Sequence, residues 1–201
     1  MDKKQKGKFI VLYAGNNLGK SIQIREIVKI LKRYKLKLKT IKYPIYDLKP
    51  TGELINDYLR KNNPNKLDPK AFQTLHAANK YQYQPILEKD LKDGWWVIAE
   101  DYAGTSLTWG VATGVTLKYL EKINQGLTKP DLEIVLIGKP FDSGHEKGHI
   151  HEDDRKLLAE VSKLHEKLAS KYSWSKISAN QKIPKVTEDI MKIIKNKFHL
   201  K

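Results

Sequence analysis

The sequence predicts an α/β fold in which helices cover both faces of one parallel β-sheet. Apolar runs of strand length alternate with helical patterns along the 201 residues. A glycine-containing turn ending in Gly-Lys-Ser separates the first apolar run from the first helix, over residues 15–21. Strands that alternate with helices need right-handed crossovers, and these place helices on both sides of the sheet. A chain of this length with 40% hydrophobic content buries one good core, so we expect a single domain over residues 1–201.

The first hundred residues supply three predicted strands and three predicted helices. In chain order we expect a strand over 9–14, a helix over 21–34, a strand over 37–43, helices over 51–60 and 70–91, and a strand over 95–99. Pro44 closes the second strand, and Pro85 is expected to kink the long helix because it removes one hydrogen bond. The strand over 95–99 is apolar throughout, as is typical of a central strand buried on both faces.

The second hundred residues continue the alternation. We expect a helix over 104–124, a strand over 132–137, a helix over 154–172, a short strand over 175–178 and a final helix over 186–198. The helix over 104–124 is predicted despite Gly110 and Gly114. The basic residues 1–7 are expected to be flexible.

The turn after the first strand has the sequence of a phosphate-binding loop. Residues 14–21 read A-G-N-N-L-G-K-S and match G-x-x-x-x-G-K-[ST] except at Ala14, where the first glycine belongs. Backbone N–H groups and the start of the next helix can surround a polyphosphate, Lys20 can reach its outer phosphates, and Ser21 can bind Mg2+. A left-handed conformation at Ala14 would cost on the order of 1 kcal/mol. An ordinary turn with a chance lysine is disfavoured because a strand and a helix flank the loop as the motif requires.

Composition excludes several classes of protein. The chain has no cysteine, which rules out disulfides, thiolate metal sites and cysteine nucleophiles and fits a reducing compartment. Its apolar runs are far shorter than a membrane span and no signal peptide is evident, so we expect a cytoplasmic protein. The net charge of +15 suggests nucleic-acid binding, but most lysines alternate with apolar residues at helical spacing. A basic surface that attracts anionic substrates is therefore favoured over dedicated nucleic-acid recognition.

Ordered local motifs, read together, resemble those of a known enzyme family. They are G-K-S-I-Q at 19–23 for G-K-S-T-Q, K-Y-P at 42–44 for R-F-P, A-A-N-K at 77–80 for S-A-N-R, L-T-K-P-D-L at 127–132 for L-P-K-P-D-L, and V-T-E-D-I at 186–190 in the closing helix. Over residues 9–198 the chain thus resembles thymidylate kinases, which are P-loop nucleoside monophosphate kinases. The resemblance implies a three-layer P-loop NTPase fold with a five-stranded parallel sheet flanked by helices. It also implies a lid near residues 139–154, a homodimer, and Mg2+-dependent transfer of a phosphoryl group from ATP to dTMP.

The resemblance assigns site residues position by position. The ATP-binding residues are Asn16, Asn17, Leu18, Gly19, Lys20, Ser21, Ile22 and Asn180. The residues for dTMP or another nucleoside monophosphate are Lys42, Pro44, Tyr46, His76, Asn79, Lys80 and Tyr102. The catalytic residues are Lys20, Glu100 and Asp101, and the Mg2+ residues are Ser21 and Glu100. His76 stands where the family stacks a phenylalanine on thymine, and Lys80 where an arginine reaches the base.

Two departures from the family pattern concern the acceptor phosphate. Tyr46 replaces one arginine, and Asp101 in Glu100-Asp101-Tyr102 replaces another. Charge-assisted hydrogen bonds contribute roughly 1.5 to 3 kcal/mol each, so the loss of both weakens monophosphate binding unless other cations replace them. The candidate replacements are Lys42, Lys80, Lys139, Lys147 and Arg155. Asp101 either serves the metal or a second cation, or caps the helix that begins near Gly104.

Alternative functions follow from these departures and from the net charge of +15. The first is a catalytically impaired relative that binds nucleotides, the second is a kinase for a different nucleoside monophosphate, and the third is a nucleic-acid binder whose affinity falls with salt. His145, His149 and His151 lie in the predicted lid, and their spacing favours a phosphate-covering lid over a metal centre.

Overall fold

The computed structural model describes residues 6–141 and 154–200 of the chain. It contains a five-stranded sheet in the order β2-β3-β1-β4-β5, in which neighbouring strands are parallel. The strands are β1 (Lys8–Ala14), β2 (Leu38–Lys42), β3 (Trp96–Glu100), β4 (Leu132–Ile137) and β5 (Ser175–Ser178). The predicted α/β fold with a five-stranded parallel sheet is confirmed.

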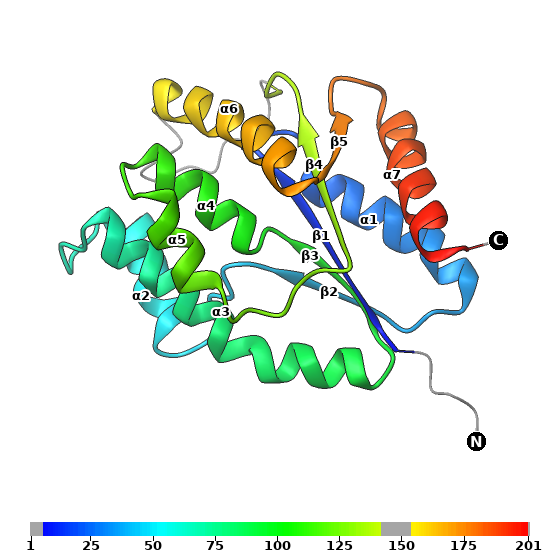
Figure 1. The fold of residues 1–201 in the computed structure, drawn as a ribbon, viewed down its shortest axis with the longest axis horizontal. Coiled ribbons are helices and arrows are strands. Elements are labelled where there is room, and N and C mark those ends of the chain that lie inside the picture. The colour runs from blue at the N-terminus through cyan, green and yellow to red at the C-terminus, as the bar shows by residue number, and fades with distance from the viewer. Residues whose placement is uncertain (1–5, 142–153, 201) are drawn as a thin grey trace.

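Helices flank this sheet on both faces (Figure 1). They are α1 (Lys20–Leu31), followed by a 3-10 turn (Lys32–Tyr34), α2 (Thr51–Arg60), α3 (Pro69–Lys92), α4 (Ala103–Ala112), α5 (Leu117–Asn124), α6 (Arg155–Tyr172) and α7 (Ile183–Phe198). α1 and α7 pack on one face, and α3 to α6 pack on the other. In the described part of the chain no helix is long and apolar enough to cross a membrane.

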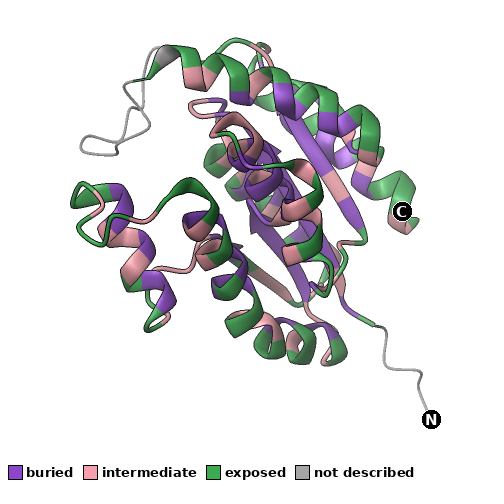
Figure 2. Cartoon of the chain, turned by 60° about the vertical axis from the view of Figure 1, so that its left-hand side comes forward, coloured by how far each residue is buried: buried purple, intermediate pink, exposed green. Residues whose placement is uncertain are grey.

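The middle strand β1 joins the two halves of the core. Its side chains alternate between faces, so Phe9 and Val11 pack with the α3–α6 helices while Ile10 and Leu12 pack with α1 and α7. All four are at most 2% exposed. Figure 2 shows the buried residues along the strands and the exposed ones on the outer faces of the helices. The sheet therefore holds the loops at its carboxyl edge on a rigid base.

The long helix α3 begins at a clear capping signal. Asp68 accepts a hydrogen bond from the amide of Ala71 at 2.7 Å, and Pro69 occupies the first turn, where no amide hydrogen is needed. The helix continues through Pro85 to Lys92. Its first half lies beside α2, where Tyr58 and Phe72 stack with ring centroids 3.5 Å apart.

The single helix expected over residues 104–124 is wrong, because the structure has two helices there. α4 ends in a Schellman motif in which the amide of Val115 donates to the carbonyl of Gly110 at 2.8 Å and the amide of Gly114 donates to the carbonyl of Val111 at 3.0 Å. Gly114 has a φ of 88°, in the left-handed region that glycine tolerates. Gly110 lets Leu120 of α5 approach, since a Cβ there would lie 2.6 Å from the leucine side chain. Both glycines thus serve the turn between the helices.

Candidate active site

A cavity of about 710 Å³ opens at the carboxyl edge of the sheet. The loop after β1, the loop after β2 and the segments after β3 and β5 all contribute to its lining, together with α3 and α4. Ligands of open parallel sheets bind at this edge, where the strands end and the loops begin. Its volume lies within the range of about 300 to 1,000 Å³ that is typical of small-molecule binding sites.

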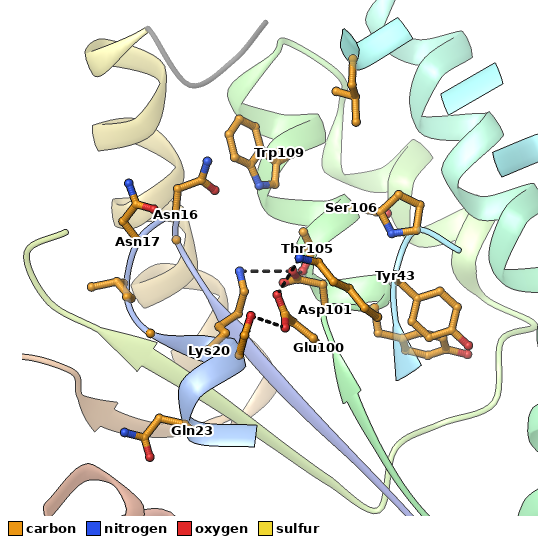
Figure 3. Close-up of a pocket in the computed structure, with 18 of the residues that line it drawn as sticks. Asn16, Asn17, Lys20, Gln23, Tyr43, Glu100, Asp101, Thr105, Ser106 and Trp109 are labelled. Atoms are coloured by element: carbon orange, nitrogen blue, oxygen red, sulfur yellow. Dashed lines mark hydrogen bonds and ion pairs between the residues drawn. The ribbon is translucent and has the colours of Figure 1, made fainter. Parts of the chain in front are cut away.

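The loop between β1 and α1 has the backbone of a phosphate-binding loop. Its left-handed residues are Asn17, with a φ of 57°, and Gly19, with a φ of 78°. Ala14 is the last residue of β1 and pairs with Leu136 of β4, so the departure from the motif at this position causes no left-handed strain. Asn16 and Asn17 border the cavity (Figure 3), and the first residues of α1 line it too, so the N-terminus of this helix is available to an anion.

Lys20 points from the first turn of α1 across the cavity (Figure 3). Its Nζ donates to the carbonyl oxygen of Ala14 at 3.0 Å and lies 3.2 Å from Oδ2 of Asp101. Both charged side chains are 13% exposed. The ammonium group is therefore fixed over the loop in a partly desolvated site, where an anion gains more from it than in open water.

Ser21 and Glu100 meet at the floor of the cavity. The Oγ of Ser21 donates to Oε2 of Glu100 at 2.7 Å, and Nζ of Lys42 lies 3.3 Å from Oε1 of the same carboxylate. Glu100 is the last residue of β3 and pairs in register with Lys42 of β2 and Leu12 of β1. A hydroxyl and a carboxylate are hard oxygen ligands, which fits Mg2+.

Clusters of three or more His, Cys, Asp or Glu residues able to hold a metal do not occur within residues 6–141 and 154–200. A cation at Ser21 and Glu100 would therefore take most of its remaining ligands from water and substrate phosphates, as Mg2+ commonly does. The lid over 139–154 and its three histidines lie mainly outside the described residues, so those expectations stay predictions.

Asp101 faces the cavity from the start of the turn into α4. It has a φ of 63°, its amide donates to Leu12, and its Oδ1 accepts a hydrogen bond from Oγ1 of Thr105 at 2.7 Å. The N-cap of α4 is Tyr102, and no side chain caps this helix. The carboxylate of Asp101 therefore serves Lys20 and Thr105, which is not the helix-capping arrangement considered from the sequence.

Lys80 lies on the α3 wall and is buried, with 2% exposure. Its Nζ donates to Oγ of Ser106 at 2.7 Å and to the carbonyl oxygen of His76 at 3.0 Å. Burial lowers the pKa of Lys80 to about 7, and the negative charge of Asp101 partly opposes this shift. Both His76 and Lys80 line the cavity, so the two positions flagged by the sequence come together on one wall.

Two of the expected site residues form hydrogen bonds with the backbone of neighbouring loops and do not line the cavity. Asn79 is fully buried, exchanges two hydrogen bonds with the backbone of Ile45 at 2.8 and 2.9 Å, and donates to Thr51. Asn180 makes the same kind of pair with the backbone of Lys139, at 2.6 and 2.8 Å. They fix the loops after β2 and β4. The other expected site residues line the cavity, namely Asn16, Asn17, Leu18, Gly19, Lys20, Ser21, Ile22, Lys42, Pro44, Tyr46, His76, Lys80, Glu100, Asp101 and Tyr102.

Sequence reasoning missed several cavity residues. Thr105, Ser106 and Trp109 come from α4, and Gln73 comes from α3. Gln73 precedes His76 by three positions and Lys80 by seven, a helical spacing that could have placed all three on one face. Arg60, the last residue of α2, was missed as well.

Arg60 is a cavity cation that the motifs do not reveal. Its guanidinium carbon lies 4.7 Å from the ring centroid of Tyr46, in a cation–π contact, and both residues line the cavity. Tyr46 is the position at which the family carries an arginine. The chain therefore places a guanidinium group next to the position that lacks one.

This fold and this cavity define a protein of the P-loop nucleotide-binding class. The chain matches the family model described as thymidylate kinase over residues 15–190. It belongs to the thymidylate kinase family, and the resemblance seen in the motifs is confirmed.

Individual relatives agree with this family over nearly the whole chain. The sequence is 23% identical to the thymidylate kinase of Dictyostelium discoideum over 197 residues, covering 96% of this chain and 87% of that protein. It is 26% identical to the thymidylate kinase of Plasmodium falciparum over 195 residues, covering 95% of this chain and 91% of that protein. A solved structure of Candida albicans thymidylate kinase superposes with a TM-score of 0.77 at 23% identity, over 95% of this chain and 92% of that one. This last likeness shows the fold.

Proposed function

We propose that this protein is an ATP-dependent thymidylate kinase that converts dTMP to dTDP. The observation that carries the proposal is that one cavity joins the phosphate-binding loop, with Lys20 and Ser21, to a second compartment walled by α3 and α4. Membership of the thymidylate kinase family supports dTMP as the acceptor. A kinase needs both compartments to be continuous, because the acceptor oxygen must lie in line with the phosphoryl group that it attacks.

The residues at the loop supply positioning and positive charge, which are the main needs of phosphoryl transfer. Loop amides and the start of α1 surround the donor phosphates, and Lys20 neutralises charge on the transferred group. Ser21 and Glu100 would hold Mg2+, which shields the negative charge that phosphates carry and develop. Asp101 keeps Lys20 over the loop before the nucleotide arrives.

The acceptor compartment has its own cations. Lys42, Arg60 and Lys80 line it, and each can contact an anionic acceptor or its base. Lysine supplies charge without the bidentate fork of arginine, whereas Arg60 supplies both. These residues are the candidates to bind the acceptor phosphate in place of the two family arginines, whose positions are occupied here by Tyr46 and Asp101.

A coupled assay of ADP release tests the proposal, with dTMP, dUMP, dCMP, dGMP and AMP as acceptors. We expect turnover with dTMP, and loss of at least about 100-fold in Lys20→Met, in which the phosphate contact is gone. Lys29→Met is the matched control, because Lys29 lies on the same helix and pairs with Glu26 on the surface. Turnover with none of the five acceptors would contradict the proposal. ATP binding without turnover would favour the impaired nucleotide-binding relative instead.

The same proposal includes a homodimer, which the family resemblance supports. α3 carries two exposed apolar side chains, Tyr81 at 38% and Ile86 at 45% exposure. Light scattering after size-exclusion chromatography measures the mass, and a species of about 46 kDa, twice the 23.2 kDa of the chain, would support it. A mass of one chain at micromolar concentration would contradict it.

A further inference from the structure

The cavity has a polar phosphate end and a distinct far end, joined by a continuous series of contacts. Lys20 lies 3.2 Å from Asp101, and Asp101 accepts a hydrogen bond from Thr105. The next residue, Ser106, accepts from Lys80 at 2.7 Å, and Lys80 also donates to the carbonyl oxygen of His76. This series leads from the phosphate-binding loop across α4 to the wall formed by α3.

The far end suits a flat heterocycle. The ring of His76 meets Phe72 edge to face, with centroids 4.6 Å apart, and Phe72 stacks on Tyr58 at 3.5 Å. All three residues line the cavity. Aromatic walls of this kind stabilise a planar ligand by stacking and dispersion. A base of an acceptor nucleotide would stack here, with its phosphate directed toward Lys20.

Gln73 provides an unpaired polar atom at this end. The residue is 3% exposed and lines the cavity, and its Oε1 is buried without a hydrogen-bond partner among the described residues. A buried acceptor without a donor costs roughly 1 to 3 kcal/mol, so a ligand that supplies an N–H group there gains this amount. The side chain belongs to the same face of α3 as His76 and Lys80, three and seven positions later.

The polar groups that line the cavity together with Gln73 indicate which edge of a base the cavity would bind. The protonated amine of Lys80 donates and cannot accept, and Ser106 accepts from Lys80, which leaves the hydroxyl hydrogen of Ser106 to donate. Two donors and one unpaired acceptor therefore line the same cavity. Their complement is a base edge with a carbonyl oxygen next to an N–H group, as in the imide of thymine or uracil. The amino group and unprotonated ring nitrogen of cytosine present the opposite order.

We propose that Gln73 is a specificity-determining residue, whose Oε1 accepts the imide N–H of an oxo-pyrimidine base and so selects it over a 4-amino pyrimidine. The proposal rests on the proposed function for the orientation of the acceptor. It concerns a side chain that the family motifs do not include.

The test compares Gln73→Met with the wild-type protein. Methionine is of similar length but cannot accept this hydrogen bond well. We expect kcat/KM for dTMP to fall about tenfold or more, and the preference for dTMP over dCMP to fall by a similar factor, since one hydrogen bond of about 1.4 kcal/mol corresponds to tenfold. The KM for ATP should stay within about twofold, because Gln73 lies at the other end of the cavity. A variant that merely loosened the fold would affect both nucleotides alike.

Gln84→Met is the matched control, with the same chemical change on the same helix. Gln84 bonds Gly126 and Thr128, does not line the cavity, and should leave the preference between the two pyrimidines unchanged. An unchanged dTMP preference in Gln73→Met would overturn the proposal.

A second measurement decides the proposal if Gln73→Met does not fold. Calorimetric titration of the wild-type protein with dTMP and with N3-methyl-dTMP measures how much the imide N–H contributes to the affinity for the nucleotide. We expect at least about tenfold weaker binding of the methylated nucleotide. Equal affinities would overturn the proposal about Gln73. If the wild-type protein turns over no acceptor, the proposed kinase function fails, and the same titrations still decide whether the imide N–H is recognised, as the proposal about Gln73 requires.

Discussion

The ammonium group of Lys20 lies 3.2 Å from a carboxylate oxygen of Asp101, and both side chains are 13% exposed. Lys20 is the lysine of the phosphate-binding loop, and it pairs with the acidic side chain that directly follows β3. A triphosphate that binds the loop must compete with this carboxylate for the ammonium group. Asp101 thus preorganises Lys20 and opposes the incoming negative charge at the same time.

Asp101→Asn should therefore tighten the binding of ATP. The substitution removes an ion pair that competes for Lys20 and a negative charge that repels phosphate. We expect the free energy of ATP binding to improve by up to about 1 kcal/mol, which is about fivefold in the dissociation constant. Calorimetric titration with a non-hydrolysable ATP analogue and Mg2+ measures it. Asp90→Asn serves as the control, because Asp90 pairs with Lys39 away from the cavity. Weaker analogue binding in Asp101→Asn would show that the carboxylate assists the nucleotide instead.

Ser21→Ala should raise the Mg2+ concentration needed for half-maximal turnover. The Oγ of Ser21 lies 2.7 Å from Oε2 of Glu100, and its removal takes away one of the two protein oxygens at this place. We expect a shift of about tenfold, as for the loss of one ligand or its supporting partner. Ser170→Ala, on the exposed face of α6, is a control that should not move the Mg2+ titration. An identical titration curve in both variants would remove Ser21 from the metal site.

Gly114→Ala should destabilise the fold by about 1 kcal/mol, because a left-handed conformation at a non-glycine residue carries a cost of this order. The φ of Gly114 is 88°, and a Cβ there would meet no atom within 4 Å, so strain and not a clash causes the loss. Gly114→Asn should cost less, since asparagine tolerates this conformation better. Urea unfolding measures both variants. An alanine variant as stable as wild type would contradict the assigned Schellman ending of α4.

The sequence allowed the strands to be located closely, because β1, β3 and β4 are short, mostly apolar runs and β2 alternates lysine with apolar residues. The strand bounds 132–137 and 175–178 agree with β4 and β5. The break between α4 and α5 was missed, since apolar residues continue at helical spacing through Leu107 and Val111. Whether a glycine ends a helix or only weakens it depends on what packs against it, and the contact of Gly110 with Leu120 joins residues from two helices.

Cavity residues, like the strands, were predicted from the sequence where the signal is local. Lys20, Ser21 and Glu100 adjoin predicted strand ends, and parallel strands bring such positions together. The roles of Gln73 and Arg60 depend on how α2 and α3 pack, which local patterns do not contain. Nor does the sequence show that Lys80 is buried, although burial decides its charge.

Lys80→Met should make the stability of the protein less dependent on pH in the alkaline range. The pKa of Lys80 is about 7 in the folded protein and about 10.5 when unfolded, so between these values the unfolded chain binds one more proton. The stability of the wild-type protein should thus rise with pH across this window, relative to Lys80→Met, by up to about 1.4 kcal/mol per pH unit. Below pH 7 the buried lysine is charged in both states, and its contribution no longer changes.

Chemical unfolding of both proteins at several values between pH 6 and pH 10 measures this difference. Asp101 is the acidic group that acts on Lys80, so Asp101→Asn should lower the pKa of Lys80 further and move the start of the window to lower pH. Lys89→Met provides the matched control, because Lys89 is exposed on the same helix and pairs with Asp93. A stability difference between wild type and Lys80→Met that is constant from pH 7 to pH 10 would show that Lys80 keeps its proton throughout. In that case Asp101 and the hydroxyl of Ser106 stabilise its charge more strongly than burial opposes it.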